Sequence, residues 1–280
     1  MQSSKRTFLQ VCAVVFACAL LSGTASFGAA AAEKTSTLDL GNGVTLALAA
    51  ISAGKFLKGS PREENGHAND EADRFAEKPA QQEVTIRRPF SLGITEVTQA
   101  QYEQVIGKNP SLVKGAQLPV DSVSWDEAMQ FCQTLSAKTG RIVRLPTEAE
   151  WEYACRAGGT SRFYYGDDPE HTQLGDYAWY AANSGGKTQP VARKKPNAWG
   201  LYDMAGNVWE WCSDFYGGPY DQKPVTDPAG PAIAPDGRLR ILRGGCWETG
   251  PLSCRSANRG GLSAGRAASR CGFRVAVESP

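Results

Sequence analysis

The sequence predicts a single compact, loop-rich α+β domain with little regular secondary structure, and three observations support this class. The 280 residues include 30 glycines and 16 prolines, which favours loops and turns over long helices. Hydrophobic residues make up 41% and charged residues 21%, so an ordered core is expected. Short strand-like runs alternate with helix-start signals, and neither a linker nor a fixed-period repeat divides residues 42–278.

The first 32 residues have the pattern of a secretory signal. Lys5 and Arg6 precede a mostly apolar stretch over 7–21, and small residues fill 22–32. The apolar stretch is short for a membrane span, so we expect a cleaved signal, with an uncleaved anchor as the alternative. The protein is therefore expected to be exported, either periplasmic or secreted, with no further membrane contact. Residues 33–41 are polar and are expected to form a flexible start.

Strand-like segments follow in the next part of the chain. Residues 44–57 contain two such pieces around a turn at 52–54, and residues 84–87 and 90–94 give two more. Between them, residues 59–80 are charged and rich in turn formers, which predicts a surface loop. Near the C-terminus, residues 239–242 and 273–277 are the clearest further strands.

Three helices are predicted from capping boxes. In this motif a hydroxyl side chain caps the helix start, and a Glu or Gln three residues later reaches back to the cap. The first helix should end near Ile106 and the second at Gly140, a residue type common at helix C-termini. The three pairs are Thr98 with Gln101, Ser124 with Glu127, and Thr147 with Glu150.

Charge and histidine content exclude two classes of function. The 30 basic and 29 acidic residues nearly cancel, which argues against nucleic acid as the main partner. The chain has only two histidines, His67 and His171, so a metal site with three histidine ligands is excluded.

Six of the eight cysteines lie beyond the signal segment. An even number of cysteines in an exported protein favours disulfides, but six cysteines allow fifteen pairings, so spacing alone leaves the connectivity open. These cysteines are Cys132, Cys155, Cys212, Cys246, Cys254 and Cys271.

Several motifs together resemble the formylglycine-generating enzyme family, also called sulfatase-modifying factors. The resemblance covers roughly residues 45–277 and implies a single domain with a C-type-lectin-like core. It also implies oxidation of a cysteine in a sulfatase-type protein or peptide, using oxygen, a thiol reductant and copper. We expect the protein to be a monomer. The motifs are RLPTEAEWEYACR (144–156), GLYDMAGNVWEW (200–211), RGGCW (243–247), RSANR (255–259) and GFRV (272–275).

The copper-binding pattern of this family is altered here. The family holds copper with two cysteines five residues apart. Counted from the RGGCW motif, the first of these positions falls near Thr249, and counted back from Arg255, the second falls near Pro251. The two are close together because this chain is about three residues shorter between these motifs. The cysteines available in this region are Cys246 and Cys254, which are the candidate catalytic residues. Three interpretations of these two cysteines stay open. They are structural thiols or disulfide partners, or they form a relocated copper or redox pair, or Cys246 acts as a single reactive thiol.

The resemblance also implies a disulfide pattern. A cysteine at Cys155 would pair with one near Cys254, and a cysteine at Cys132 with one near Cys271. Cys212 and Cys246 would then be paired with each other or free.

A calcium site is the second implication of the resemblance. Its ligands would be the Asp203 carboxylate, the Gly206 and Val208 carbonyls, and the Glu210 carboxylate, which are the hard oxygen donors that Ca²⁺ requires. In the alternative interpretation, Arg144 or Arg243 neutralises Asp203 and Glu210 in buried ion pairs.

The substrate groove of the family is matched by Trp209, Trp247, Arg255 and Arg259, although core packing or Arg–Trp stacking explains the same residues. Two further functions therefore remain open beside cysteine oxidation. One is a non-catalytic, calcium-stabilised, lectin-like binding domain. The other is periplasmic oxidation of a different substrate.

Overall fold

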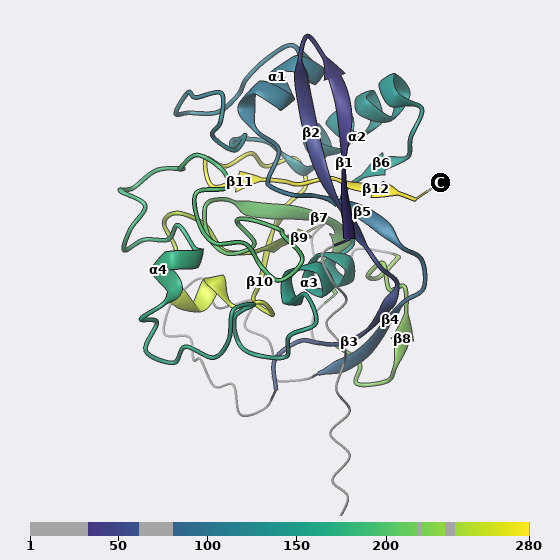
Figure 1. The fold of residues 1–280 in the computed structure, drawn as a ribbon, viewed down its shortest axis with the longest axis vertical. Coiled ribbons are helices and arrows are strands. Elements are labelled where there is room, and N and C mark those ends of the chain that lie inside the picture. The colour runs from purple at the N-terminus through teal and green to yellow at the C-terminus, as the bar shows by residue number, and fades with distance from the viewer. Residues whose placement is uncertain (1–32, 62–80, 218–219, 233–238, 280) are drawn as a thin grey trace, which may run out of the picture.

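Three small sheets carry the fold of the computed structural model, which describes residues 33–61, 81–217, 220–232 and 239–279 (Figure 1). The five-stranded sheet has the order β1 (Glu33–Gly41), β2 (Val44–Ile51), β5 (Phe90–Gly93), β12 (Ala276–Glu278) and β6 (Val143–Arg144). The four-stranded sheet runs β10 (Arg259–Ser263), β9 (Leu239–Arg243), β7 (Trp209–Phe215), β11 (Cys271–Gly272). The three-stranded sheet runs β3 (Gly54–Lys58), β4 (Gln82–Ile86), β8 (Val225–Thr226).

The three predicted capping boxes are all formed. Thr98, Ser124 and Thr147 each accept a hydrogen bond from the backbone three residues later, and the side chain at that later position bonds back to the cap. Gly140 ends the second helix with a left-handed φ of 69°, a conformation that glycine adopts without strain. The helices are α1 (Gln99–Ile106), α2 (Trp125–Thr139), α3 (Glu148–Arg156), the short α4 (Leu174–Tyr177) and the 3-10 turn η2 (Pro251–Cys254).

The expected flexible start over residues 33–41 is wrong, because this segment is strand β1, paired antiparallel with β2. Leu38 and Leu40 are buried, whereas Thr37 and Asp39 between them are exposed, as expected for a strand with one face on the core. The expected strand over 273–277 is shifted, since β12 begins at Ala276.

Two sequence predictions lie outside the described residues: the signal over 1–32 and most of the surface loop over 59–80. Among the described residues, no helix is long and apolar enough to cross a membrane.

Two hydrophobic clusters form the core. The first lies between the β1–β2 hairpin and helices α1 and α2, where Phe131 contacts Phe273 at a ring-centroid distance of 5.2 Å. The second surrounds α3 and contains Trp151 and Cys155. Figure 1 shows α3 between the four-stranded sheet and the sheet formed by β3, β4 and β8. Apart from Glu150, every residue of α3 is buried, so the charged side chains of this helix must find partners inside the protein.

Candidate functional site

Helix α3 carries two buried glutamates that hold basic side chains from three distant segments. Glu148 binds Lys58 Nζ at 2.8 Å and Arg259 Nε at 2.6 Å, so it joins β3 to β10. Burial by itself would raise the pKa of Glu148, but Arg259 and Lys58 outweigh it and hold the pKa well below its usual range. Glu152, one turn later, binds Arg156 Nε at 2.9 Å and also pairs with Arg243. These pairs explain how a charged helix is accommodated in the core.

A third buried glutamate, Glu210 on β7, belongs to the segment 203–210 that the sequence predicts as a calcium loop. Arg274 binds it through two hydrogen bonds, Nε to Oε2 at 2.6 Å and Nη2 to Oε1 at 2.7 Å. The indole nitrogen of Trp151 also donates to Glu210 Oε2 at 2.8 Å. The expected alternative, an ion pair at this glutamate, is therefore formed, but its cation is Arg274 and neither Arg144 nor Arg243.

Asp203 is the second predicted calcium ligand with a side-chain oxygen. It is buried, has a left-handed φ of 54°, and its Oδ2 accepts a hydrogen bond from the Ala192 amide at 2.7 Å. Burial, assisted by the negative charge of Glu210, raises the pKa of Asp203 to about 6. This electrostatic environment favours either a proton or a cation close to Asp203.

Glu96, which no sequence motif marked as a site residue, lies beside these two acids. Its side chain is fully buried, and neither carboxylate oxygen has a hydrogen-bond partner among the described residues. Burial, followed by the charges of Asp203 and Glu210, raises the pKa of Glu96 well above its usual value. Arg274 is the cation common to all three acids, and the group would carry excess negative charge if all three were ionised.

The donor types of this group are the hard oxygens that calcium prefers, but both Glu210 oxygens already accept hydrogen bonds from Arg274 or Trp151. The buried oxygens of Glu96 lack partners within the described parts of the chain, and Asp203 and Glu210 supply hard carboxylate donors. No group of three or more His, Cys, Asp or Glu side chains in the described part of the chain is arranged to hold a metal. Any calcium ion at Asp203 and Glu210 would therefore also need the carbonyl groups of Gly206 and Val208.

The predicted groove residues are divided between different environments. Trp209 on β7 is largely buried and faces Gly260, where an added Cβ atom would lie 3.2 Å from the indole ring. Arg259, the neighbour of Gly260 on β10, is bound to Glu148. Successive side chains of a strand point to opposite faces, so Trp209 and Arg259 do not share a surface.

The other two groove residues are also held by contacts within the protein. The half-buried Trp247 donates its indole N–H to the Ser269 carbonyl at 3.3 Å. Arg255 donates from Nη1 to Ser60 Oγ at 3.1 Å and from Nε to the Leu252 carbonyl at 3.0 Å. Of the four predicted groove residues, Trp247 is the most accessible to a ligand.

The candidate catalytic cysteines are buried thiols. Cys246 and Cys254 have exposed fractions of 0% and 1%. Burial raises the pKa of Cys246 to about 11 and the pKa of Cys254 well above its usual value. Because the thiolate is the form that binds copper and acts as nucleophile, both thiols are poorly suited to either role as arranged here.

The disulfides implied by the resemblance are not formed. All six cysteines beyond residue 32 are free and buried. Cys155 and Cys254 share one hydrophobic cluster and Cys132 and Cys271 share the other, but within these clusters the thiols pack as small apolar groups. The Cys155 thiol instead contacts the Met204 carbonyl at 3.9 Å.

Several residues of this region could not be identified from local pattern. Arg274 belongs to the GFRV motif that carried the resemblance, but nothing in that motif indicates that its side chain lies beside Glu210. Glu96 could not be placed beside Glu210 from the sequence either. The one signal in the sequence was that Glu96 lies between the strand-like segment 90–94 and the helix cap Thr98, where a buried acidic residue is unusual.

A family model described as "Sulfatase-modifying factor enzyme 1-like domain" matches residues 44–279. A formylglycine-generating enzyme of Mus musculus is 34% identical over 185 residues, which are 61% of this chain and 47% of the mouse protein. A serine/threonine-protein kinase pkn1 of Chlamydia pneumoniae is 36% identical over 162 residues, which are 58% of this chain and 24% of the kinase. The chain thus spans half or less of these two curated relatives.

Among solved structures, Treponema denticola variable protein 1 is similar over nearly its whole length. Its TM-score is 0.75 at 30% identity, and the match covers 88% of this chain and 99% of that one. A match over this share of the chain concerns the whole domain rather than a single motif.

Proposed function

The chain belongs to the sulfatase-modifying factor enzyme 1-like family, and from this membership we propose that it is a calcium-stabilised, lectin-like binding domain for a peptide or protein. In this proposal the protein is exported, monomeric and not a copper-dependent cysteine oxidase. Similar sequences or folds occur in proteins that are named as a formylglycine-generating enzyme, a kinase and a variable protein, so the fold alone does not determine the activity.

The observation that carries the proposal is the state of Cys246 and Cys254. Both thiols are buried, and burial raises their pKa values, so they remain protonated at neutral pH. A copper site in this family needs two thiolates, and two protonated, buried thiols do not supply them. The cysteines of this chain therefore do not fit the copper centre of the family.

The distribution of loops supports a binding role. Between α3 and β7, the fully described residues 157–208 contain α4 as their only helix and no strand beyond isolated bridges. Arg156 at the end of α3 donates to the Ser161 carbonyl of these loops at 3.1 Å, and exposed loops on a rigid scaffold are where binding residues concentrate. Trp247 is the groove residue that we propose contacts the ligand, because it is the least buried of the four.

Calcium would be held by Asp203, Glu210 and the carbonyl groups of Gly206 and Val208. The ion would neutralise the excess negative charge beside Glu96 and fix the loop that leads into β7. Calorimetric titration of chelator-treated protein with CaCl₂ tests this part. We expect saturable binding that is lost in Asp203→Asn and retained in Asp176→Asn, which changes an exposed aspartate. Equal binding by the two variants, or none by the wild type, would remove calcium from the proposal.

A turnover assay separates the binding role from oxidation. The protein would be incubated with copper, a mild thiol and a peptide containing Cys-x-Pro-x-Arg, and mass spectrometry would detect conversion of the cysteine to an aldehyde. The proposal predicts no aldehyde while an active formylglycine-generating enzyme converts the peptide in parallel. Selection from a displayed peptide library should instead yield ligands whose binding is lost in Trp247→Ala and kept in Leu112→Ala, a control at an exposed residue.

Cysteine oxidation is the second candidate, and one comparison favours it. The chain is 34% identical to the mouse formylglycine-generating enzyme, although the chlamydial kinase is similar to the same degree. Aldehyde formation that disappears in both Cys246→Ser and Cys254→Ser would establish this function. If the sulfatase-type peptide stays unchanged but another thiol substrate is oxidised through the same cysteines, the function would be oxidation of that different substrate.

A further inference from the structure

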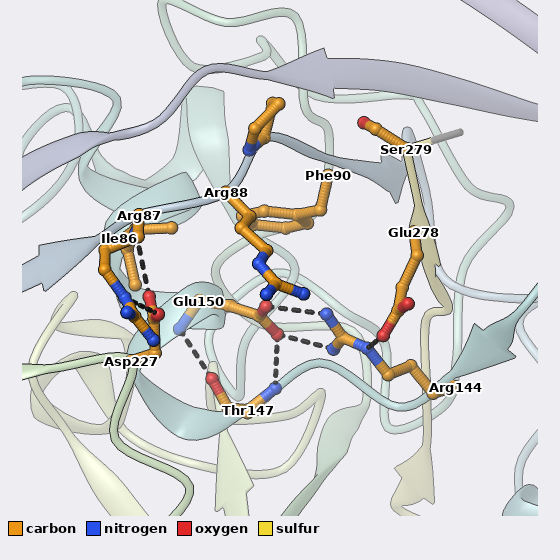
Figure 2. Close-up of a pocket in the computed structure, with 11 residues that line it drawn as sticks. Ile86, Arg87, Arg88, Phe90, Arg144, Thr147, Glu150, Asp227, Glu278 and Ser279 are labelled. Carbon is orange, nitrogen blue, oxygen red and sulfur yellow. Dashed lines mark hydrogen bonds and ion pairs between the residues drawn. The ribbon is translucent and has the colours of Figure 1, made fainter.

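A pocket of about 600 Å³ lies at the junction between the five-stranded and the three-stranded sheet. The connection from β4 to β5 forms one wall, and the segment from β6 into α3 together with the end of β12 forms the other (Figure 2). A volume of this size is in the range that small organic ligands occupy. Neither the proposed calcium loop nor the groove residues line it, so a ligand here would go beyond the proposed function.

Three arginines and three acids line this pocket, and two of the arginines are paired within it. Arg87 binds Asp227 through its backbone N–H at 2.8 Å and through Nε at 2.6 Å, using both carboxylate oxygens. Arg144 binds both oxygens of Glu150, at 2.6 and 2.7 Å. Its Nε also lies 3.4 Å from Glu278 Oε1. All three carboxylates are therefore already committed to a cation.

Arg88 is the exception. Within the described parts of the chain its guanidinium makes no direct hydrogen bond or ion pair, although its charge, after that of Arg87, helps to lower the pKa of Asp227. Figure 2 shows its side chain extending into the pocket toward the Arg144–Glu150 pair. A guanidinium presents a planar fork of N–H donors that matches a carboxylate in two-point contact.

Apolar groups lie beside this unpaired cation. Pro89 is exposed, and the ring of Phe90 and the side chain of Ile86 form a mostly buried floor. A ligand with one negative charge and a compact apolar body would therefore satisfy both parts of the pocket. A phosphate dianion would require a second free cation, which the described residues do not offer here.

We propose that this pocket binds a small organic monocarboxylate, with the carboxylate held by the Arg88 guanidinium and the apolar body placed over Pro89 and Phe90. Arg144 and Glu150 shape the opposite wall without taking part in charge recognition. The site would function independently of calcium and of the cysteines.

Ligand-observed NMR and calorimetry with sodium benzoate as the probe test this proposal. A ligand of this size is expected to bind in about the millimolar range. Arg88→Gln should weaken benzoate binding about tenfold or more, because a charge-assisted two-point contact is lost. Arg88→Lys should weaken it less, since the charge is kept and only the fork is lost. Arg193→Gln, at an exposed arginine far from this pocket in the chain, should bind benzoate like the wild type.

Three outcomes would overturn the proposal. The first is benzoate binding that is equal in Arg88→Gln and the wild type. The second is no benzoate binding by a wild-type protein whose thermal unfolding is normal. The third is inorganic phosphate binding at Arg88 in preference to benzoate, which would assign the pocket to phosphorylated ligands. None of these outcomes depends on calcium binding or turnover, so each is distinguishable from failure of the proposed function.

Discussion

Arg274 and Glu210 form a buried pair in which both carboxylate oxygens are used, at 2.6 and 2.7 Å. The same guanidinium donates to the Gly93 carbonyl at 3.0 Å and to the Tyr202 carbonyl at 2.9 Å. One side chain thus connects the end of β5, the loop before β7 and β7 itself. Since Glu96 and Asp203 add negative charge around it, Arg274 is the cation on which this part of the core depends.

Replacing this arginine should strongly destabilise the protein. Arg274→Met leaves Glu210 buried without its cation, and breaking a buried pair in this way costs about 3–5 kcal/mol. Urea unfolding in the presence of a calcium chelator would measure the change. Arg193→Met, which alters an exposed arginine, should change the free energy of unfolding by less than about 0.5 kcal/mol. Similar losses for the two variants would show that Arg274 has no special structural role.

Stability should fall as pH rises through the weakly acidic range because of Asp214. Burial, with a further contribution from nearby Glu148, raises the pKa of Asp214 from 3.8 to about 6. Between these values the folded protein holds a proton that the unfolded chain has released, so the folded state is favoured at the low end and loses stability toward pH 6. The shift corresponds to a loss of about 3 kcal/mol.

Asp214→Asn should remove this part of the pH dependence. The difference in unfolding free energy between wild type and variant, measured by urea titration from pH 4 to pH 7, should change in favour of the variant as pH rises. Asp176→Asn, at an exposed aspartate whose pKa is lowered by Lys195, should leave the wild-type trend between pH 4 and 6 in place. A constant difference between wild type and Asp214→Asn would contradict the prediction.

The contribution of the α3 capping box to the free energy of unfolding should be measurable as well. Thr147 Oγ1 accepts a hydrogen bond from the Glu150 amide at 3.1 Å, and Glu150 Oε2 accepts one from the Thr147 amide at 2.8 Å. Thr147→Ala removes one half of this exchange and should lower the free energy of unfolding by about 1 kcal/mol, measured by urea titration. Thr160→Ala, at an exposed residue beyond the helix, is the matched control and should be close to neutral. Equal stability of Thr147→Ala and the wild type would show that the cap contributes nothing.

The helices could be predicted from the sequence because their signals are local. Ser124 and Glu127, for example, are three residues apart and determine the start of α2 through contacts with each other. Strand β1 carried a local signal too, since Leu38 and Leu40 alternate with polar residues before an Asn42-Gly43 turn, a strong hairpin pattern. The polar composition of residues 33–41 obscured that alternation.

The candidate site could not be predicted in the same way, because its contacts are distant in sequence. Arg274 meets Glu210 across 64 residues and Lys58 meets Glu148 across 90. No periodicity indicates which arginine neutralises which glutamate, and the expected cations for Glu210 were Arg144 or Arg243. The pocket around Arg88 is assembled from separate segments of the chain, so no motif could indicate it.

The reactivity of Cys246 and Cys254 tests the central claim most directly. The native protein would be treated with iodoacetamide at pH 8, and mass spectrometry would follow alkylation of each cysteine over time. The thiol introduced by Leu112→Cys, at a residue that is 76% exposed, serves as the internal reference. We predict that Cys246 and Cys254 react at least about a hundredfold more slowly than this reference, because they are buried and protonated. Alkylation of either cysteine as fast as the reference, with protection by copper, would contradict the claim and favour a catalytic thiolate site.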